Sequence, residues 1–250
     1  MKRILIITAI VIAIIALSLW GWSLYQKGKL SSNKKQSEQK QTSYVPPLAT
    51  VENIEVKDPK NLQQIKESVG SITDISLPAL SGANNDNKDN KDFAEFSYKG
   101  TNGQPVLLDD FLRASNIKIY PDFKKYLDQN NFTEIYCLEN NQKSYGVIFN
   151  VGRFGLGENF SYAQVKSAMS KWESTMLQDL SSLLYPQIEF SGEQLNQTLK
   201  FRDGKYRFAE INLPDGSKSS INYKIFGDPI VITTSQNCLA KVNAYILSFD

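Results

Sequence analysis

The chain has 250 residues, of which 41% are apolar and 22% are charged, and its formal net charge is +2. These fractions are those of an ordinary globular protein, while the absence of histidine excludes imidazole metal ligands and nucleophiles activated by histidine. Because seven basic residues and one acidic residue lie within the first 50 positions, residues 51–250 carry about −4, and we expect no nucleic-acid partner.

The N-terminal run Ile4–Tyr25 has 22 residues and no charge. As a helix it would be about 33 Å long, enough to cross a hydrocarbon core of about 30 Å. We therefore expect residues 4–25 to lie in the lipid bilayer, with the aromatic rings at one end settling at the membrane–water interface. The residues assigned to this membrane anchor are Ile4, Leu5, Ile6, Ile7, Ile10, Ile14, Leu17, Trp20, Trp22 and Tyr25.

A cleaved secretory signal is the competing interpretation, since Lys2 and Arg3 form a basic head and residues 16–18 form a weak cleavage pattern. The apolar stretch continues past Ser18, which favours a retained anchor. The basic head predicts a cytoplasmic N-terminus and an exported domain, although five lysines that follow the span favour the reverse orientation. We expect residues 1–25 to form the cytoplasmic tip and the transmembrane anchor.

Residues 26–50 are polar and end in a Pro-Pro pair, which predicts a flexible linker before a domain at 51–250. This domain opens with a predicted strand at 50–56. Asp58-Pro59 then predicts a helix start, with an N-cap followed by proline. A strand is predicted at 72–77, and the Asn- and Asp-rich loop 81–92 lacks the spacing of a calcium-binding EF-hand.

The next part of the domain is predicted to contain a strand, two helices and a β-hairpin. The predicted elements are a strand marked by Phe93, Phe96 and Tyr98, a helix at 106–115 with Val106, Leu107, Phe111 and Ala114 inward, a helix at 121–127, and strands at 132–138 and 144–151. Asp109 and Asp110 are adjacent, so on a helix they point about 100° apart and cannot form a catalytic dyad.

The segment Gly152–Gly157 lies between a strand and a helix, where phosphate-binding loops lie. Its spacing, G-x-x-G-x-G, is neither the dinucleotide fingerprint nor a P-loop. A flexible connection is therefore favoured over nucleotide binding.

One long amphipathic helix is predicted to begin after Ser161, which acts as N-cap and forms a capping box with Gln164. The helix would end before Pro186. Its apolar stripe, which predicts a core face, consists of Tyr162, Val165, Met169, Trp172, Met176, Leu180 and Leu183.

From residue 195 onward the pattern predicts a β meander and a closing helix. The predicted strands lie at 199–202, 206–211, 221–226 and 230–234, with Asp203-Gly204 as a two-residue hairpin turn and Ser235 as the cap of the last helix. Lys218 lies among three serines, but in an exposed turn rather than in the interior that a Ser-Lys hydrolase needs.

The two cysteines, Cys137 and Cys238, are too few for a disulfide framework or a four-thiolate zinc site. In an exported domain they could form one bridge that closes a long loop. The alternative is a pair of buried thiols that pack as small apolar side chains.

Several segments resemble a known group of proteins. They are Leu107–Leu112 with Ile117–Ile119, Asn131–Thr133, Lys171–Met176 with Asp179-Leu180, and Ile230–Ser235. Over roughly residues 95–245 the chain resembles a domain of membrane-anchored proteins from small-genome candidate-phylum bacteria. The resemblance implies an N-terminal anchor, a polar linker and an α+β domain, and it implies no particular chemistry because the group has no assigned activity.

We therefore predict an α+β fold, an antiparallel sheet packed with helices, and the repeat of hairpin and helix at 132–184 and 206–247 suggests two related subdomains divided near 186–195. The predicted function is an envelope binding or scaffolding module that acts through protein contacts, without cofactor, metal or catalytic residues. One alternative is a histidine-free hydrolase that uses carboxylates such as Glu139, Glu158 or Asp228. Another is a component of a pilus or secretion platform.

Overall fold

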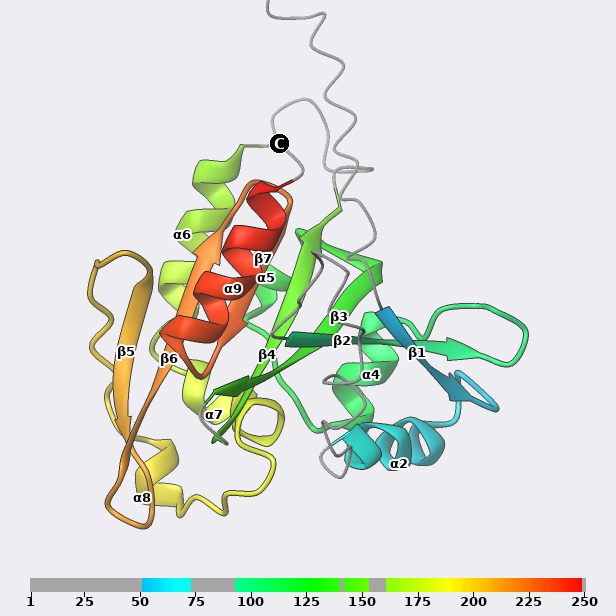
Figure 1. Ribbon diagram of the computed structural model, residues 1–250, viewed down its shortest axis with the longest axis horizontal. Coiled ribbons are helices and arrows are strands. Elements are labelled where there is room, and N and C mark those ends of the chain that lie inside the picture. The colour runs from blue at the N-terminus through cyan, green and yellow to red at the C-terminus, as the bar shows by residue number, and fades with distance from the viewer. Residues whose placement is uncertain (1–50, 73–92, 140–141, 153–160, 249–250) are drawn as a thin grey trace, which may run out of the picture. The chain divides into compact units, whose positions relative to one another are not determined.

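Seven strands form one mixed sheet in the computed structural model, in the order β1-β2-β3-β4-β7-β6-β5 (Figure 1). The structure describes residues 51–72, 93–139, 142–152 and 161–248, which belong to the second of the chain's two units, Val45–Asp250. The strands are β1 Val51–Val56, β2 Phe93–Gly100, β3 Leu127–Glu139, β4 Gln142–Val151, β5 Arg207–Asn212, β6 Lys218–Ile225 and β7 Pro229–Thr233. The helices are α2 Leu62–Ile72, α4 Leu108–Ala114, α5 Pro121–Lys124, α6 Tyr162–Trp172, α7 Met176–Leu184, α8 Gly192–Leu195 and α9 Gln236–Leu247. The α+β class is as predicted.

The sheet is antiparallel except at one edge, where β1 pairs in parallel with β2. Parallel neighbours need a crossover connection, and α2 lies between these strands in the chain. The prediction of an antiparallel sheet is wrong at this edge because apolar alternation does not encode strand direction. The predicted strand at 72–77 lies outside the described residues apart from Ile72, which ends α2.

The two faces of the sheet bury cores of different size. Side chains alternate along β4, so Val147 and Phe149 enter the larger core while Ile148 enters the smaller one. The larger core includes residues of α2, α4, α5, α6 and α7, and it contains the fully buried Trp172. The smaller core packs against α9, the red helix in Figure 1, through residues that include Leu239.

A disulfide joins the smaller face to its helix. Cys137 on β3 and Cys238 on α9 are bonded, with their Cα atoms 5.8 Å apart and a sequence separation of 101. Both side chains are buried in the smaller core. Of the two states that the sequence leaves open, the structure contains the bridge.

The predicted single helix after Ser161 is two helices, α6 and α7, separated by residues 173–175. The capping box of Ser161 with Gln164 is present. Three contacts at the break compete with helical continuation. Asp179 Oδ2 accepts hydrogen bonds from Trp172 Nε1 at 2.9 Å and from Thr175 Oγ1 at 2.7 Å. The Glu173 carboxylate accepts two bonds from the Arg207 guanidinium, at 2.8 and 2.9 Å.

Three further predictions need correction. The helix predicted to begin at Asp58-Pro59 begins at Leu62, because Asn61 Oδ1 caps it by accepting from the N–H groups of Gln63 and Gln64 at 3.1 and 3.3 Å. Leu107 is predicted to face the core, yet it precedes α4 and is 42% exposed.

The third correction concerns 199–202, which contains no strand and touches the sheet by a single bridge between Arg202 and Phe208. The two-residue hairpin turn at Asp203-Gly204 is therefore wrong. Arg207 Nη1 contacts Asp203 Oδ1 at 3.1 Å, which holds a wider loop.

The stretch 186–195 does not interrupt the sheet, since β4 pairs with β7 from Gly146↔Thr233 to Asn150↔Pro229. The two proposed subdomains, 132–184 and 206–247, thus share one sheet. Among the described residues, no helix combines the length and apolar character needed to span a membrane. The predicted anchor and linker at 1–50, the loop at 81–92 and residues 153–160 lie outside the described residues.

Candidate functional site

A groove of about 800 Å³ opens in the sheet where β7 ends. β7 pairs with β4 as far as Gly146↔Thr233 and with β6 as far as Asn222↔Thr233, and the chain then leaves the sheet to begin α9. β4 and β6 extend beyond that point, and residues of both extensions line the groove. Because β7 separates these two strands, they lie about 10 Å apart, two strand spacings. The groove is thus a gap one strand wide.

Backbone groups of β4 point into this gap. The Thr234 N–H donates to the Tyr145 carbonyl at 2.9 Å, so the backbone of Tyr145 faces the position of β7. Every second residue of a strand presents its N–H and C=O to the same side. The backbone of Lys143 therefore faces the gap beyond the end of β7.

The opposite wall of the gap is built in the same way by β6. The Phe226 N–H donates to the Pro229 carbonyl at 2.9 Å, which sets the side to which alternate residues of β6 turn. By this alternation Asn222 faces β7, while Ser220 and Lys218 face the gap. Both residues lie outside the ladder between β6 and β7.

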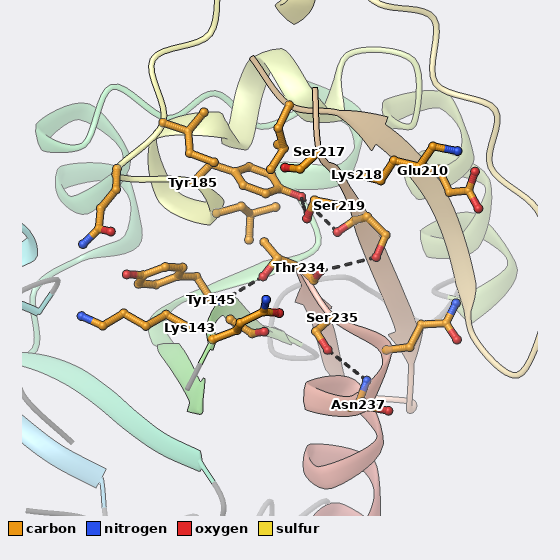
Figure 2. Close-up of a pocket in the computed structure, with 18 of the residues that line it drawn as sticks. Lys143, Tyr145, Tyr185, Glu210, Ser217, Lys218, Ser219, Thr234, Ser235 and Asn237 are labelled. Carbon is orange, nitrogen blue, oxygen red and sulfur yellow. Dashed lines mark hydrogen bonds between the residues drawn. The ribbon is translucent and has the colours of Figure 1, made fainter. Parts of the chain in front are cut away.

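The Tyr185 hydroxyl lies against the β6 wall of the groove (Figure 2). It donates to the Ser220 carbonyl at 3.0 Å and lies 3.2 Å from Ser219 Oγ. Burial raises the pKa of Tyr185, so the phenol stays protonated and acts as a donor. The Tyr185 hydroxyl thus donates to the Ser220 carbonyl in place of the backbone N–H of a neighbouring strand.

The remaining lining is rich in hydroxyls and carries few charges. Ser235 Oγ caps α9 by accepting from the N–H groups of Asn237 and Cys238, at 3.1 and 3.3 Å. Ser220 Oγ donates to the Thr234 carbonyl at 3.4 Å. The charged residues in the lining are Lys143, Lys218 and Glu210. The lining thus offers several hydrogen-bonding groups and charges of both signs.

A second, smaller cavity of about 280 Å³ contains a buried carboxyl group, that of Glu134 on β3. Glu134 is 5% exposed, and its Oε2 accepts a hydrogen bond from the Tyr98 hydroxyl. Its Oε1 is buried without a hydrogen-bond partner in the described part of the chain, as is Ser115 Oγ, another residue of the lining. Burial raises the pKa of Glu134 to about 7, although the bond from Tyr98 opposes this shift.

Of the three carboxylates predicted as hydrolase candidates, Asp228 is the one whose side chain the structure describes. Asp228 is 7% exposed and accepts a hydrogen bond from the Tyr162 hydroxyl, which ties α6 to the turn before β7. Glu139 is the last residue of β3, and Glu158 lies outside the described residues.

A third hollow, of about 470 Å³, does contain two carboxylates, but both have structural partners. Asp109 is 2.8 Å from Lys124 Nζ, and Asp179 holds the break between α6 and α7. Asp110, the neighbour of Asp109, pairs with Arg113. No group of three or more Cys, Asp or Glu side chains in the described ranges could hold a metal ion.

Sequence reasoning named Lys218 and its serines only as a weak hydrolase pattern, and it missed Glu134 and Tyr185. Lys218, Ser217, Ser219 and Ser220 do line the groove. A signal for Glu134 exists in the sequence, since it lies between Phe132 and Tyr136 at an inward position of a predicted strand. Comparison of the chain with protein-family models, curated proteins and solved structures finds no match.

Proposed function

We propose that the chain is a membrane-tethered binding module of the cell envelope that holds an extended segment of a partner protein in the groove between β4 and β6. The observation that carries this proposal is the gap of one strand width, into which the backbones of Lys143, Lys218 and Ser220 turn. Strand addition to a sheet uses main-chain hydrogen bonds for affinity and neighbouring side chains for specificity.

An extended segment suits this groove better than a compact ligand. The groove is bounded by β4 and β6, which both pair antiparallel with β7. A chain that runs in the direction of β7 could therefore hydrogen-bond to both walls. The hydroxyls of Tyr185 and Thr234 lie in the groove lining (Figure 2) and can rearrange their bonds toward a bound backbone.

The tether and the location rest on two further observations. The run Ile4–Tyr25 is long and apolar enough to anchor the chain in a bilayer. The Cys137–Cys238 bridge suits an oxidising compartment, which favours export of the domain to the outside of the membrane. The resemblance to membrane-anchored bacterial domains agrees with both. Service to a pilus or secretion platform is a narrower version of the same role.

Selection of binders from a displayed library of short random peptides tests the groove directly. The bait is the purified full-length chain, compared with its Ser219→Arg variant, in which a long side chain enters the groove beside Tyr185. Ser170→Arg is the matched control, because Ser170 is exposed on α6 and is not part of the groove.

We expect peptides selected by the unmodified chain to lose at least about tenfold in affinity for Ser219→Arg and to keep their affinity for Ser170→Arg. Peptides that bind Ser219→Arg as well as the unmodified chain would contradict the groove as the binding site. Alkylation of thiols in intact cells tests the location, since an exported domain should contain no reactive Cys137 or Cys238.

A further inference from the structure

The Glu134 cavity has an apolar wall and a small number of polar groups. The wall is formed by Val69, Ala114, Leu183 and Pro186. The polar side chains of the lining are those of Lys66, Ser115, Asn116, Glu134, Tyr145 and Ser182. Several of these residues, among them Lys66 and Asn116, are exposed, so the cavity opens to solvent. This is the composition of a small-ligand site rather than of a packing defect.

The carboxyl group of Glu134 is only half used by the protein. The Tyr98 hydroxyl occupies Oε2, and Oε1 is buried without a hydrogen-bond partner among the described residues. A buried acceptor without a partner is costly, so a ligand that supplies a donor there gains the full benefit of satisfying it. The unpartnered Ser115 hydroxyl offers a second polar contact in the same cavity.

The charged and titratable groups that face Glu134 leave its charge without a counterion in the described structure. From α2 comes Lys66, which is exposed and forms no ion pair with Glu134. The phenols of Tyr98 and Tyr145 come from β2 and β4. The residues contributed by α4 and α7 are uncharged at this cavity. Burial raises the pKa of Glu134 because no cation compensates the carboxylate.

We infer that this cavity binds a primary ammonium group carried on a short apolar stem, with the ammonium on Glu134 and the stem against the aliphatic wall. An ammonium is a compact donor of three hydrogen bonds and can reach a single oxygen atom. A guanidinium binds best to two carboxylate oxygens side by side, and Tyr98 already occupies one of them. The single available oxygen therefore selects the ammonium.

Two sources could present this chemistry. One is a free aliphatic amine, and the other is a lysine side chain, which is an ammonium on a four-carbon stem. The cavity and the groove share Tyr145 and Pro186 in their linings, so a lysine of a segment bound in the groove lies within reach of the cavity. The ammonium site itself does not rest on the proposed function, because it is built from residues of the cavity alone.

Calorimetric titration of the full-length chain with n-butylamine tests the site, with n-butanol as the uncharged probe of the same length. At about pH 8 we expect n-butylamine to bind at least about tenfold more tightly than n-butanol, and the affinity to fall toward about pH 6 as Glu134 takes up a proton. Glu134→Gln keeps the size of the side chain and should remove at least about tenfold of the amine affinity. Lys66→Met should strengthen amine binding, since it removes a competing cation at the opening.

Equal affinity for the amine and the alcohol, or an unchanged amine affinity in Glu134→Gln, would overturn the inference, as would the absence of amine binding. The two sources separate in a second arm with groove-binding peptides that contain either lysine or norleucine. A preference for lysine that Glu134→Gln abolishes assigns the site to a partner segment. Equal binding of both peptides, with n-butylamine still bound, assigns it to a free amine. Ser219→Arg should block the peptides and spare n-butylamine, so failure of the groove and failure of the cavity can be told apart.

Discussion

The two faces of the sheet are closed by different means. Five helices (α2, α4, α5, α6 and α7) contribute to the large apolar core on one face, which includes Trp172. Among the described residues α9 is the one helix on the other face, and it is bonded to β3 through Cys137 and Cys238. The helix-rich face tolerates the cost of a buried carboxyl group, Glu134, within its cavity. The comparison indicates that the burial of a large apolar area stabilises the first face, while a disulfide bond adds to the smaller apolar core of the second. The groove lies where the chain leaves β7 and begins α9, the helix of the second face.

Removal of the disulfide should have the largest effect on this comparison. The bridge has a sequence separation of 101, and loop-closure entropy predicts that Cys137→Ala with Cys238→Ala lowers the free energy of unfolding by about 4.7 kcal/mol. Chemical denaturation of the double variant and of the reduced unmodified chain measures this change. A loss below about 1 kcal/mol in both would show that apolar packing alone holds α9 to the sheet.

The next effect concerns the buried carboxyl group on the helix-rich face. The pKa of Glu134 is raised in the folded state to about 7 from 4.5, so the unfolded chain releases this proton first as the pH rises. The contribution of Glu134 to the free energy of unfolding is fully present below about pH 4.5 and is lost by about pH 7. The difference between the two pH values is about 3 kcal/mol. Denaturation of the unmodified chain and of Glu134→Gln across this range measures the difference.

For this prediction Glu134→Gln is the control. Glutamine does not titrate, so the stability of the variant depends on pH only through the other groups of the chain. The stability of the unmodified chain relative to the variant should decrease steadily between the two pH values. Parallel profiles would mean that the carboxyl group is solvated in the folded state and that the cavity is wetter than its lining indicates.

The smallest effect should come from the cap of α9. Ser235 Oγ accepts from two backbone N–H groups at the helix start, so Ser235→Ala should lower the free energy of unfolding by about 1 kcal/mol. Ser191→Ala is a matched control, because Ser191 caps the short α8, which buries no residue. If Ser191→Ala lowers the free energy of unfolding as much as Ser235→Ala does, the cap of α9 stabilises the protein no more than the cap of a short surface helix.

Local patterns in the sequence predict most of the elements of this fold. The hairpin of β3 and β4, the strands β5, β6 and β7, and the Ser235 cap of α9 follow from alternation, turn residues and capping residues. The break between α6 and α7 was not predicted in this way, because one of its contacts comes from Arg207, which lies 34 residues beyond Glu173 in the chain.

The groove could not be predicted from the sequence for a similar reason. Its existence depends on how far β7 extends relative to β4 and β6, which is a matter of register between strands that are distant in sequence. Glu134 differs, because alternation alone places it inward between Phe132 and Tyr136. A charged residue at an inward strand position is therefore a signal that sequence reasoning can use.

Amide hydrogen exchange of the full-length chain, with and without a peptide selected by it, tests the central claim most directly. If the peptide lies as a strand between β4 and β6, the amides of Lys143, Lys218 and Ser220 should become protected together, on both walls of the gap. Protection confined to the outer edge strand β1, with these three amides unchanged, would contradict the account and place strand addition at the other side of the sheet.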